Sequence, residues 1–181
     1  MKKILTFIMM FGFLFMVTGC GGNGTPESVV KGLLNGMIDG KTNEVAVEYA
    51  ANPSLLISDE NQDLYGLRNA IFSRMSFKVN DVKEYEEEAV VKVTFTTIDM
   101  PSIVHQLRKD LEDDSNYKGL AGESKTKYYN QKQVSYVENS KNKDFFRTVE
   151  LELTVKKDGS KWKVNLSNEF IWTVNGQRGV E

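Results

Sequence analysis

Residues 151–166 read LELTVKKDGSKWKVNL and predict a β-hairpin. Asp158-Gly159 is a favoured two-residue turn, and apolar and polar side chains alternate on both sides of it. Counting outward from this turn gives the cross-strand pairs Val155–Trp162, Leu153–Val164 and Leu151–Leu166. All six side chains face one way, and the opposite face carries lysines and other polar groups. One face of this hairpin is therefore expected in the core and the other in water, because a one-residue slip would exchange them.

The same period of two occurs earlier in the chain. Phe77 and Val79 lead toward Tyr85, and the positions from Val91 to Thr97 alternate between apolar or small side chains and polar ones. Two antiparallel strands connected around residues 86–88 are expected, and Met100-Pro101 ends the sheet.

Residues 25–40, ahead of the predicted strands, have apolar side chains at helical spacing. Thr25 is a good N-cap, Pro26 suits the first helical position, and Gly40 marks the end of the helix. The apolar positions between them recur at helical spacing: Val29, Val30, Leu33, Leu34, Met37 and Ile38.

Two more helices are expected before the strands. A short one spans 42–50 and ends at Asn52-Pro53, after which residues 55–57 are predicted to be extended. The next helix begins at Asp59, and its apolar stripe consists of Leu64, Leu67, Ile71 and Met75.

Residues 100–126 read as a polar insertion that contains a helix. Its apolar positions are Ile103, Val104, Leu107 and Leu111. Residues 128–137 fit a helix or an edge strand, and residues 170–176 fit a strand or a short terminal helix, because both periods match in part. The predicted class is α+β, with N-terminal helices packed on the concave face of a curved antiparallel sheet and a helical insertion between its strands.

The N-terminus has the pattern of a secretory leader. Lys2 and Lys3 precede residues 4–17, an apolar run broken only by Thr6 and Gly12. The run is shorter than the roughly 20 residues of a permanent membrane span. It ends in Val17-Thr18-Gly19-Cys20, which resembles the lipobox of bacterial lipoproteins, although Val17 and Thr18 are less usual there.

The lipobox resemblance implies a lipid anchor. Residues 1–19 are then the signal peptide, Cys20 carries diacylglycerol, and residues 20–24 form a Gly-rich tether to a single domain at 25–181. Two acyl chains suffice for stable anchoring. The expected location is the extracytoplasmic face of the cell membrane, with the bilayer as a partner through acylated Cys20.

The whole pattern resembles a known group of proteins. The helix after a lipobox tether, the order of elements, and the closing segment Lys156 to Val164 with its Lys-Asp-Gly turn and Trp162 are similar to small Gram-positive lipoproteins of the nuclear transport factor 2-like, cystatin-like superfamily. The resemblance covers most of 25–176 and implies a cone-shaped domain. Members of that superfamily differ widely in function, so the fold does not carry a function over.

Composition excludes several classes of protein. The chain of 181 residues has 23 basic and 25 acidic groups, one His and one Cys. An even charge balance argues against nucleic-acid binding, and a single cysteine excludes a disulfide framework. Loss of Lys2 and Lys3 with the leader changes the net charge from −2 to −4.

Metal sites are not expected. His105 is the only histidine, it falls on the exposed flank of the insertion helix, and zinc would lack ligands. Asp114 begins the best register for a calcium loop, but Lys118 and Lys125 occupy positions that require oxygen ligands. No cofactor is predicted.

A catalytic set is also not predicted. Isomerase-like and dehydratase-like enzymes of this superfamily use an Asp or His with a Tyr inside the pocket. Such residue types occur here, but the sequence does not place two of them in one cavity: Asp63, Tyr65, Tyr85, Asp99 and Tyr128.

Tyr128, Tyr129 and Trp172 are the candidate binding residues, since aromatic side chains bury large areas with few rotatable bonds. We expect a non-catalytic module that binds a small ligand or an envelope protein. The alternatives are a proton-transfer enzyme that uses the pocket and a purely structural envelope protein.

Overall fold

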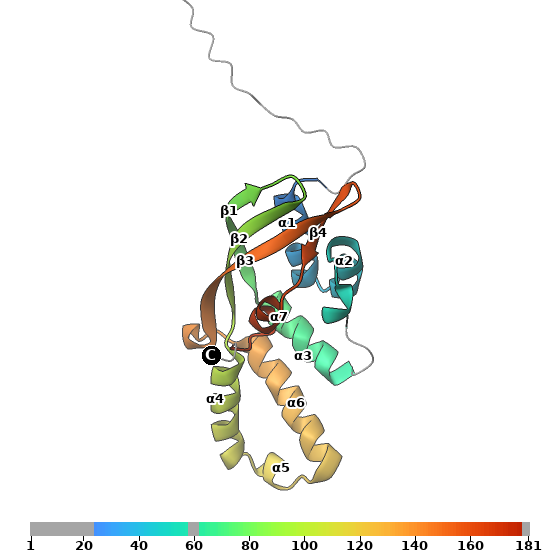
Figure 1. Cartoon of the computed structure of the whole chain (residues 1–181). Helices are drawn as coiled ribbons and strands as arrows, with labels where there is room; N and C mark the ends of the chain where they lie inside the picture. Colours follow the sequence, from blue (N-terminus) through green and yellow to red (C-terminus); the bar gives the residue numbers. More distant parts are fainter. Residues whose placement is uncertain (1–23, 58–61, 179–181) are drawn as a thin grey trace, which may run out of the picture.

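The computed structural model describes residues 24–57 and 62–178, which form helices around one four-stranded sheet (Figure 1). The α-helices in this part of the chain are α1 Pro26–Ile38, α2 Thr42–Tyr49, α3 Gln62–Ser73, α4 Met100–Asp113, α5 Ser115–Lys118, α6 Gly122–Asn139 and α7 Asn168–Val174. Two 3₁₀ turns are η1 Pro53–Leu55 and η2 Lys143–Phe145. The strands are β1 Ser76–Glu84, β2 Glu88–Ile98, β3 Phe146–Asp158 and β4 Lys161–Asn165.

The sheet is antiparallel throughout, in the order β1-β2-β3-β4. Val91, Val93 and Phe95 of β2 are fully buried, as the period of two predicts. A bulge between Val79 and Asp81 shifts the register of β1 against β2. The fold class is α+β, with helices packed against a curved antiparallel sheet.

The closing hairpin is confirmed, but its predicted register is wrong by two residues. Asp158 pairs with Lys161, Lys157 with Trp162 and Val155 with Val164, so the turn is Gly159-Ser160. Gly159 has φ +62° and takes the first turn position, which lets two opposite charges close the hairpin. A slip of two residues leaves every side chain on its predicted face, and all six apolar residues are buried.

Helix α1 fits its prediction closely. The side chain of Thr25 accepts a hydrogen bond from the Ser28 amide at 3.3 Å, and Leu33, Leu34 and Met37 are fully buried. Helix α7 joins the same core through Phe170, whose ring meets that of Phe95 edge-on at 6.1 Å between centroids.

Four local expectations need comment. The extended segment expected at 55–57 is wrong. Pro53 starts the η1 turn, and its carbonyl accepts hydrogen bonds from the amides of Leu56 and Ile57. The expected helix start at Asp59 lies outside the described residues. The two ambiguous segments are helical: residues 128–137 lie in α6 and most of 170–176 lies in α7.

The insertion is larger than predicted. α4 extends away from the sheet, α5 turns the chain, and α6 returns, so the inserted helices occupy residues 100–139 rather than 100–126 (Figure 1). We call α4, α5 and α6 the helical arm. Within the described residues, no helix is long and apolar enough to cross a membrane.

Candidate functional site

The outer end of the helical arm is built around Asp114. Its side chain accepts hydrogen bonds from the backbone amides of Asn116 at 2.9 Å and Tyr117 at 3.3 Å, which caps α5. The Tyr128 hydroxyl of α6 donates to Asp114 Oδ2 at 2.7 Å, and Lys132 Nζ lies 3.9 Å from the same oxygen. One carboxylate therefore joins α5 to α6, where the calcium interpretation had placed a first ligand.

These contacts favour the ionised carboxylate. The Tyr128 hydrogen bond lowers the pKa of Asp114, and the two backbone amides and Lys132 act in the same direction against desolvation. The rings of Tyr117 and Tyr128 lie 6.2 Å apart between centroids, and Lys132 Nζ lies 5.1 Å from the Tyr128 centroid. These contacts fix Asp114, the two tyrosine rings and Lys132 relative to one another at the end of the arm.

An open groove of about 690 Å³ lies beside this cluster. We call it the tip groove, and its main lining residues are Arg108, Leu111, Tyr117, Lys118, Lys125 and Tyr129. Glu112, Gly122 and Thr126 complete the lining. Its volume is in the range of small-molecule sites in proteins.

Sequence spacing explains how these side chains meet. Leu111 and Glu112 follow Arg108 by three and four residues, so both lie beside it on one side of α4. Lys125 and Tyr129 are four residues apart on α6, so the two helices present one wall each.

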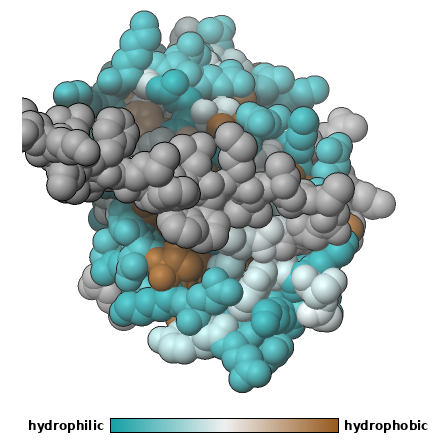
Figure 2. Space-filling view, turned by 90° about the horizontal axis from the view of Figure 1, so that it is seen from above, coloured by the Kyte–Doolittle hydropathy of each residue, from teal (hydrophilic) through white to brown (hydrophobic). Residues whose placement is uncertain are grey.

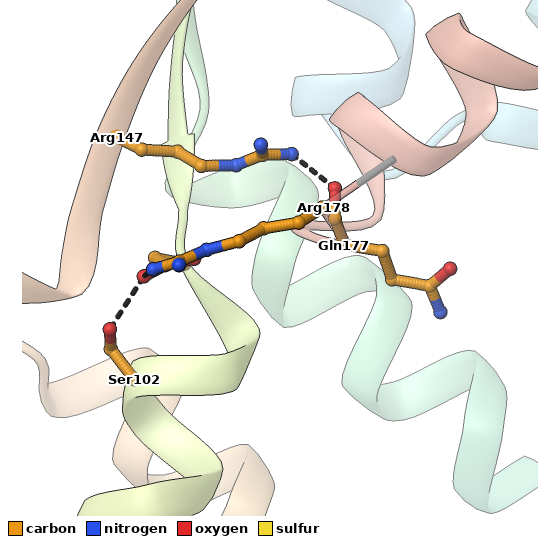
Figure 3. A network of polar contacts seen from close by, with 5 residues as sticks. Ser102, Arg147, Gln177 and Arg178 are labelled. Carbon is orange, nitrogen blue, oxygen red and sulfur yellow. Dashed lines mark hydrogen bonds and ion pairs between the residues drawn. The ribbon is translucent and has the colours of Figure 1, made fainter. Parts of the chain in front are cut away.

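A second polar site lies at the opposite end of α4. Arg178 donates to the carboxylate of Asp99 through Nε at 3.1 Å and Nη2 at 2.6 Å, and the Ser102 hydroxyl donates at 2.5 Å. Figure 3 shows Arg147 reaching from β3 to the carbonyl oxygen of Gln177 beside this pair. We call these five residues the clasp.

The carboxylate at the centre of the clasp is buried and paired. Asp99 is 4% exposed, and the hydrogen bonds from Arg178 lower its pKa, aided by Ser102 and opposed by burial. The Met100 amide also donates to the Gly176 carbonyl at 3.0 Å. The clasp thus ties the end of the described chain to the junction of β2 and α4. A depression of about 410 Å³ adjoins it, with His105 and Phe145 among its lining residues.

A family model described as "Domain of unknown function (DUF5105)" matches residues 38–174, from the end of α1 to the end of α7. The chain belongs to the DUF5105 family. The matched segment includes the whole sheet, the helical arm and the tip groove. No curated protein matches the chain.

The DUF5105 chain is also similar to a solved structure from Bacillus subtilis subsp. subtilis str. 168, described as a "putative lipoprotein (ycdA)". The identity is 15%, the TM-score is 0.47, and the match covers 76% of this chain and 45% of that one. The DUF5105 chain therefore spans less than half the length of that protein.

The structure separates the three predicted binding residues. Tyr129 lines the tip groove, Tyr128 lies beside it and bonds to Asp114, and Trp172 is half-buried on α7. Trp172 is not among the residues that line the groove. Cys20, the predicted lipidation site, lies outside the described residues.

Three of the residues considered for proton transfer, Asp99, Tyr85 and Tyr128, are also separated. Asp99 precedes α4, whereas Tyr128 donates a hydrogen bond to Asp114 at the other end of α4, about 20 Å away for a helix of this length. Tyr85 is 60% exposed in the β1–β2 turn. Asp63 and Tyr65 lie in the first turns of α3. His105 is exposed on α4, as predicted.

Sequence reasoning missed Arg108, Tyr117, Lys118 and Lys125 as site residues. The available signal was the spacing of four between Lys125 and Tyr129, which has meaning only if 122–139 is a helix. Among the described residues, no group of three or more His, Cys, Asp or Glu side chains has the arrangement of a metal site.

Proposed function

We propose that this DUF5105 protein is a membrane-anchored extracytoplasmic lipoprotein that binds a small ligand in the tip groove without catalysis. The observation that carries the proposal is the position of the groove. The described chain begins at the sheet end of the molecule, whereas the tip groove lies at the far end of the helical arm (Figure 1). An anchor at the N-terminus therefore leaves the groove accessible from outside.

The anchor is proposed from the sequence. Lys2, Lys3, the apolar run and Cys20 stand in the order that lipidation requires, and Gly21, Gly22, Asn23 and Gly24 follow. Four extended residues reach about 14 Å, which keeps the domain close to the bilayer. Where grey atoms do not cover it, the surface in Figure 2, seen from the sheet end, is mostly hydrophilic with a few hydrophobic areas. Acyl chains would thus supply the membrane affinity.

The finer fold assignment belongs to the same proposal. We infer that α1 and the curved sheet are a variant of the nuclear transport factor 2-like, cystatin-like cone. The support is the packing of the apolar face of α1 against β1, β2 and β4, together with the Lys-Asp-Gly hairpin that ends the sheet. The helical arm is then an addition to that cone, and it carries the groove.

The absence of catalysis is proposed from how the polar groups are used. Asp99 is the buried carboxylate of the clasp, and both of its oxygens already accept hydrogen bonds from Arg178, with a further one from Ser102. Among the described residues that line the tip groove, Glu112 is the one acidic residue and there is no histidine. This set supports recognition better than it supports general acid–base chemistry.

Native mass spectrometry of the lipidated protein, extracted gently from its own cells, tests the proposal. The wild type should retain mass beyond the chain and its acyl groups. Thr126→Trp fills the groove and should lose that mass, whereas Gln131→Trp, on an exposed part of α6 outside the groove, should keep it. Equal retention in both variants would place the ligand elsewhere. Loss of a co-purifying protein from Thr126→Trp alone would instead favour a protein-interaction module.

A further inference from the structure

The tip groove concentrates positive charge in an acidic protein. Its lining contains the cations Arg108, Lys118 and Lys125 and the anion Glu112, a net charge of +2, while the full chain has a net charge of −2. A groove with low-dielectric walls strengthens the field of the charges that line it. This contrast in charge favours a negatively charged ligand.

The cations of the groove have weak partners of their own. Lys118 Nζ lies 4.0 Å from Asp113, at the limit of an ion pair, and both side chains are exposed. Lys125 Nζ lies 4.6 Å from the Tyr117 ring centroid, a contact that leaves its N–H groups available. In the part of the chain that the structure describes, no carboxylate oxygen lies within 4 Å of the charged groups of Arg108 or Lys125. An incoming anion would displace no strong internal ion pair.

The rest of the lining is suited to an apolar body. Tyr117 and Tyr129 contribute aromatic side chains, and Leu111 is a buried apolar residue in the last turn of α4. A volume of about 690 Å³ accommodates a molecule of metabolite size.

We propose that the tip groove binds a small organic anion, with a carboxylate or phosphate group among Arg108, Lys118 and Lys125 and an apolar or aromatic body against the tyrosines. This inference rests on the proposed function and names its ligand class. The same acidic group could come from a lipid headgroup. The groove lies at the opposite end from the start of the described chain, so the structure favours a dissolved ligand (Figure 1).

Fluorine NMR with the lipidated protein in phosphatidylcholine nanodiscs tests the inference. The probes are 4-fluorophenyl phosphate and its neutral analogue 4-fluorobenzyl alcohol, and empty nanodiscs are the blank. The anionic probe should broaden more than the neutral one on binding. Arg108→Glu and Lys125→Glu should each weaken its binding at least about tenfold, because a charge-assisted contact is replaced by repulsion. Lys78→Glu, the same charge change on exposed β1, should bind as the wild type does.

The other outcomes separate the inference from the proposed function. If both probes bind equally and Thr126→Trp removes both, the groove binds ligands but the anionic class is wrong. If Thr126→Trp changes the binding of neither probe, both proposals are wrong. Vesicles of phosphatidylcholine and phosphatidylglycerol should leave the bound phosphate probe in place. Displacement by these vesicles would overturn the dissolved ligand in favour of a headgroup.

Discussion

Gly36 of α1 allows α2 to pack closely against it. A Cβ atom at this position would lie 2.0 Å from Val45 Cγ1 and 2.9 Å from Val45 Cβ. We expect Gly36→Ala to lower the free energy of unfolding by about 1–3 kcal/mol, because an overpacked contact outweighs the better helix propensity of alanine. Urea unfolding measures the change. Gly66→Ala, in α3 with open space around it, should be neutral or stabilising, and equal loss in both variants would contradict this packing.

Asp99 is the residue on which the clasp depends. Asp99→Asn removes the charge that Arg178 contacts and places an amide donor beside two other donors. We expect a melting temperature several degrees lower at pH 7. Asp113→Asn, whose side chain is fully exposed, should melt as the wild type does. An unchanged melting temperature for Asp99→Asn would mean that the clasp contributes little to stability.

The difference in melting temperature between the wild type and Asp99→Asn should depend on pH. The pKa of Asp99 is lowered in the folded state, so its stabilising contribution is complete above the unfolded pKa of about 3.9 and is lost as pH falls through the folded pKa. The difference in melting temperature between wild type and Asp99→Asn should therefore be constant near neutrality and shrink below about pH 4. A difference that grows in acid would contradict this sign.

At the scale of elements, alternation predicts which face is buried better than it predicts register. Placing Asp158 or Gly159 first in the turn gives registers that differ by two residues, and both put Trp162 and Val164 on the core side. Local turn conformation decides between them, through the φ of +62° at Gly159. The sequence pattern predicts which side chains share a face, but it does not predict this torsion angle.

Helix α6 shows why the candidate site was only partly predictable. Val137 is its one buried residue, so its apolar period is weak and a strand fitted equally well. Tyr129 was found by residue type alone. Lys125 and Arg108 join it only because α4 and α6 pack side by side, which is a tertiary contact without a local signal.

The Tyr128 hydroxyl group should contribute to holding the helical arm together at its outer end. Tyr128→Phe removes the donor to Asp114 Oδ2 and keeps the ring against Tyr117. We expect severalfold faster amide hydrogen exchange in α5 and the first turns of α6, with β2 and β3 unchanged. Tyr85→Phe, at an exposed turn, is the control. Unchanged exchange in α5 would show that the ring contact and the Asp114–Lys132 ion pair order the arm without this hydrogen bond.

At the scale of the whole molecule, Cys20 is the expected attachment point of a domain whose groove lies at the other end. We predict that Cys20→Ser releases or mislocalises the protein, since the chain has no other cysteine for thioether lipidation. Incorporation of labelled palmitate decides the matter, because an uncleaved apolar leader at 4–17 can itself hold a precursor in the membrane. Wild type and Gly22→Ser should be labelled and should partition into detergent, and Cys20→Ser should be unlabelled. A labelled Cys20→Ser protein would contradict the anchor, and with it the orientation that leaves the tip groove facing outward.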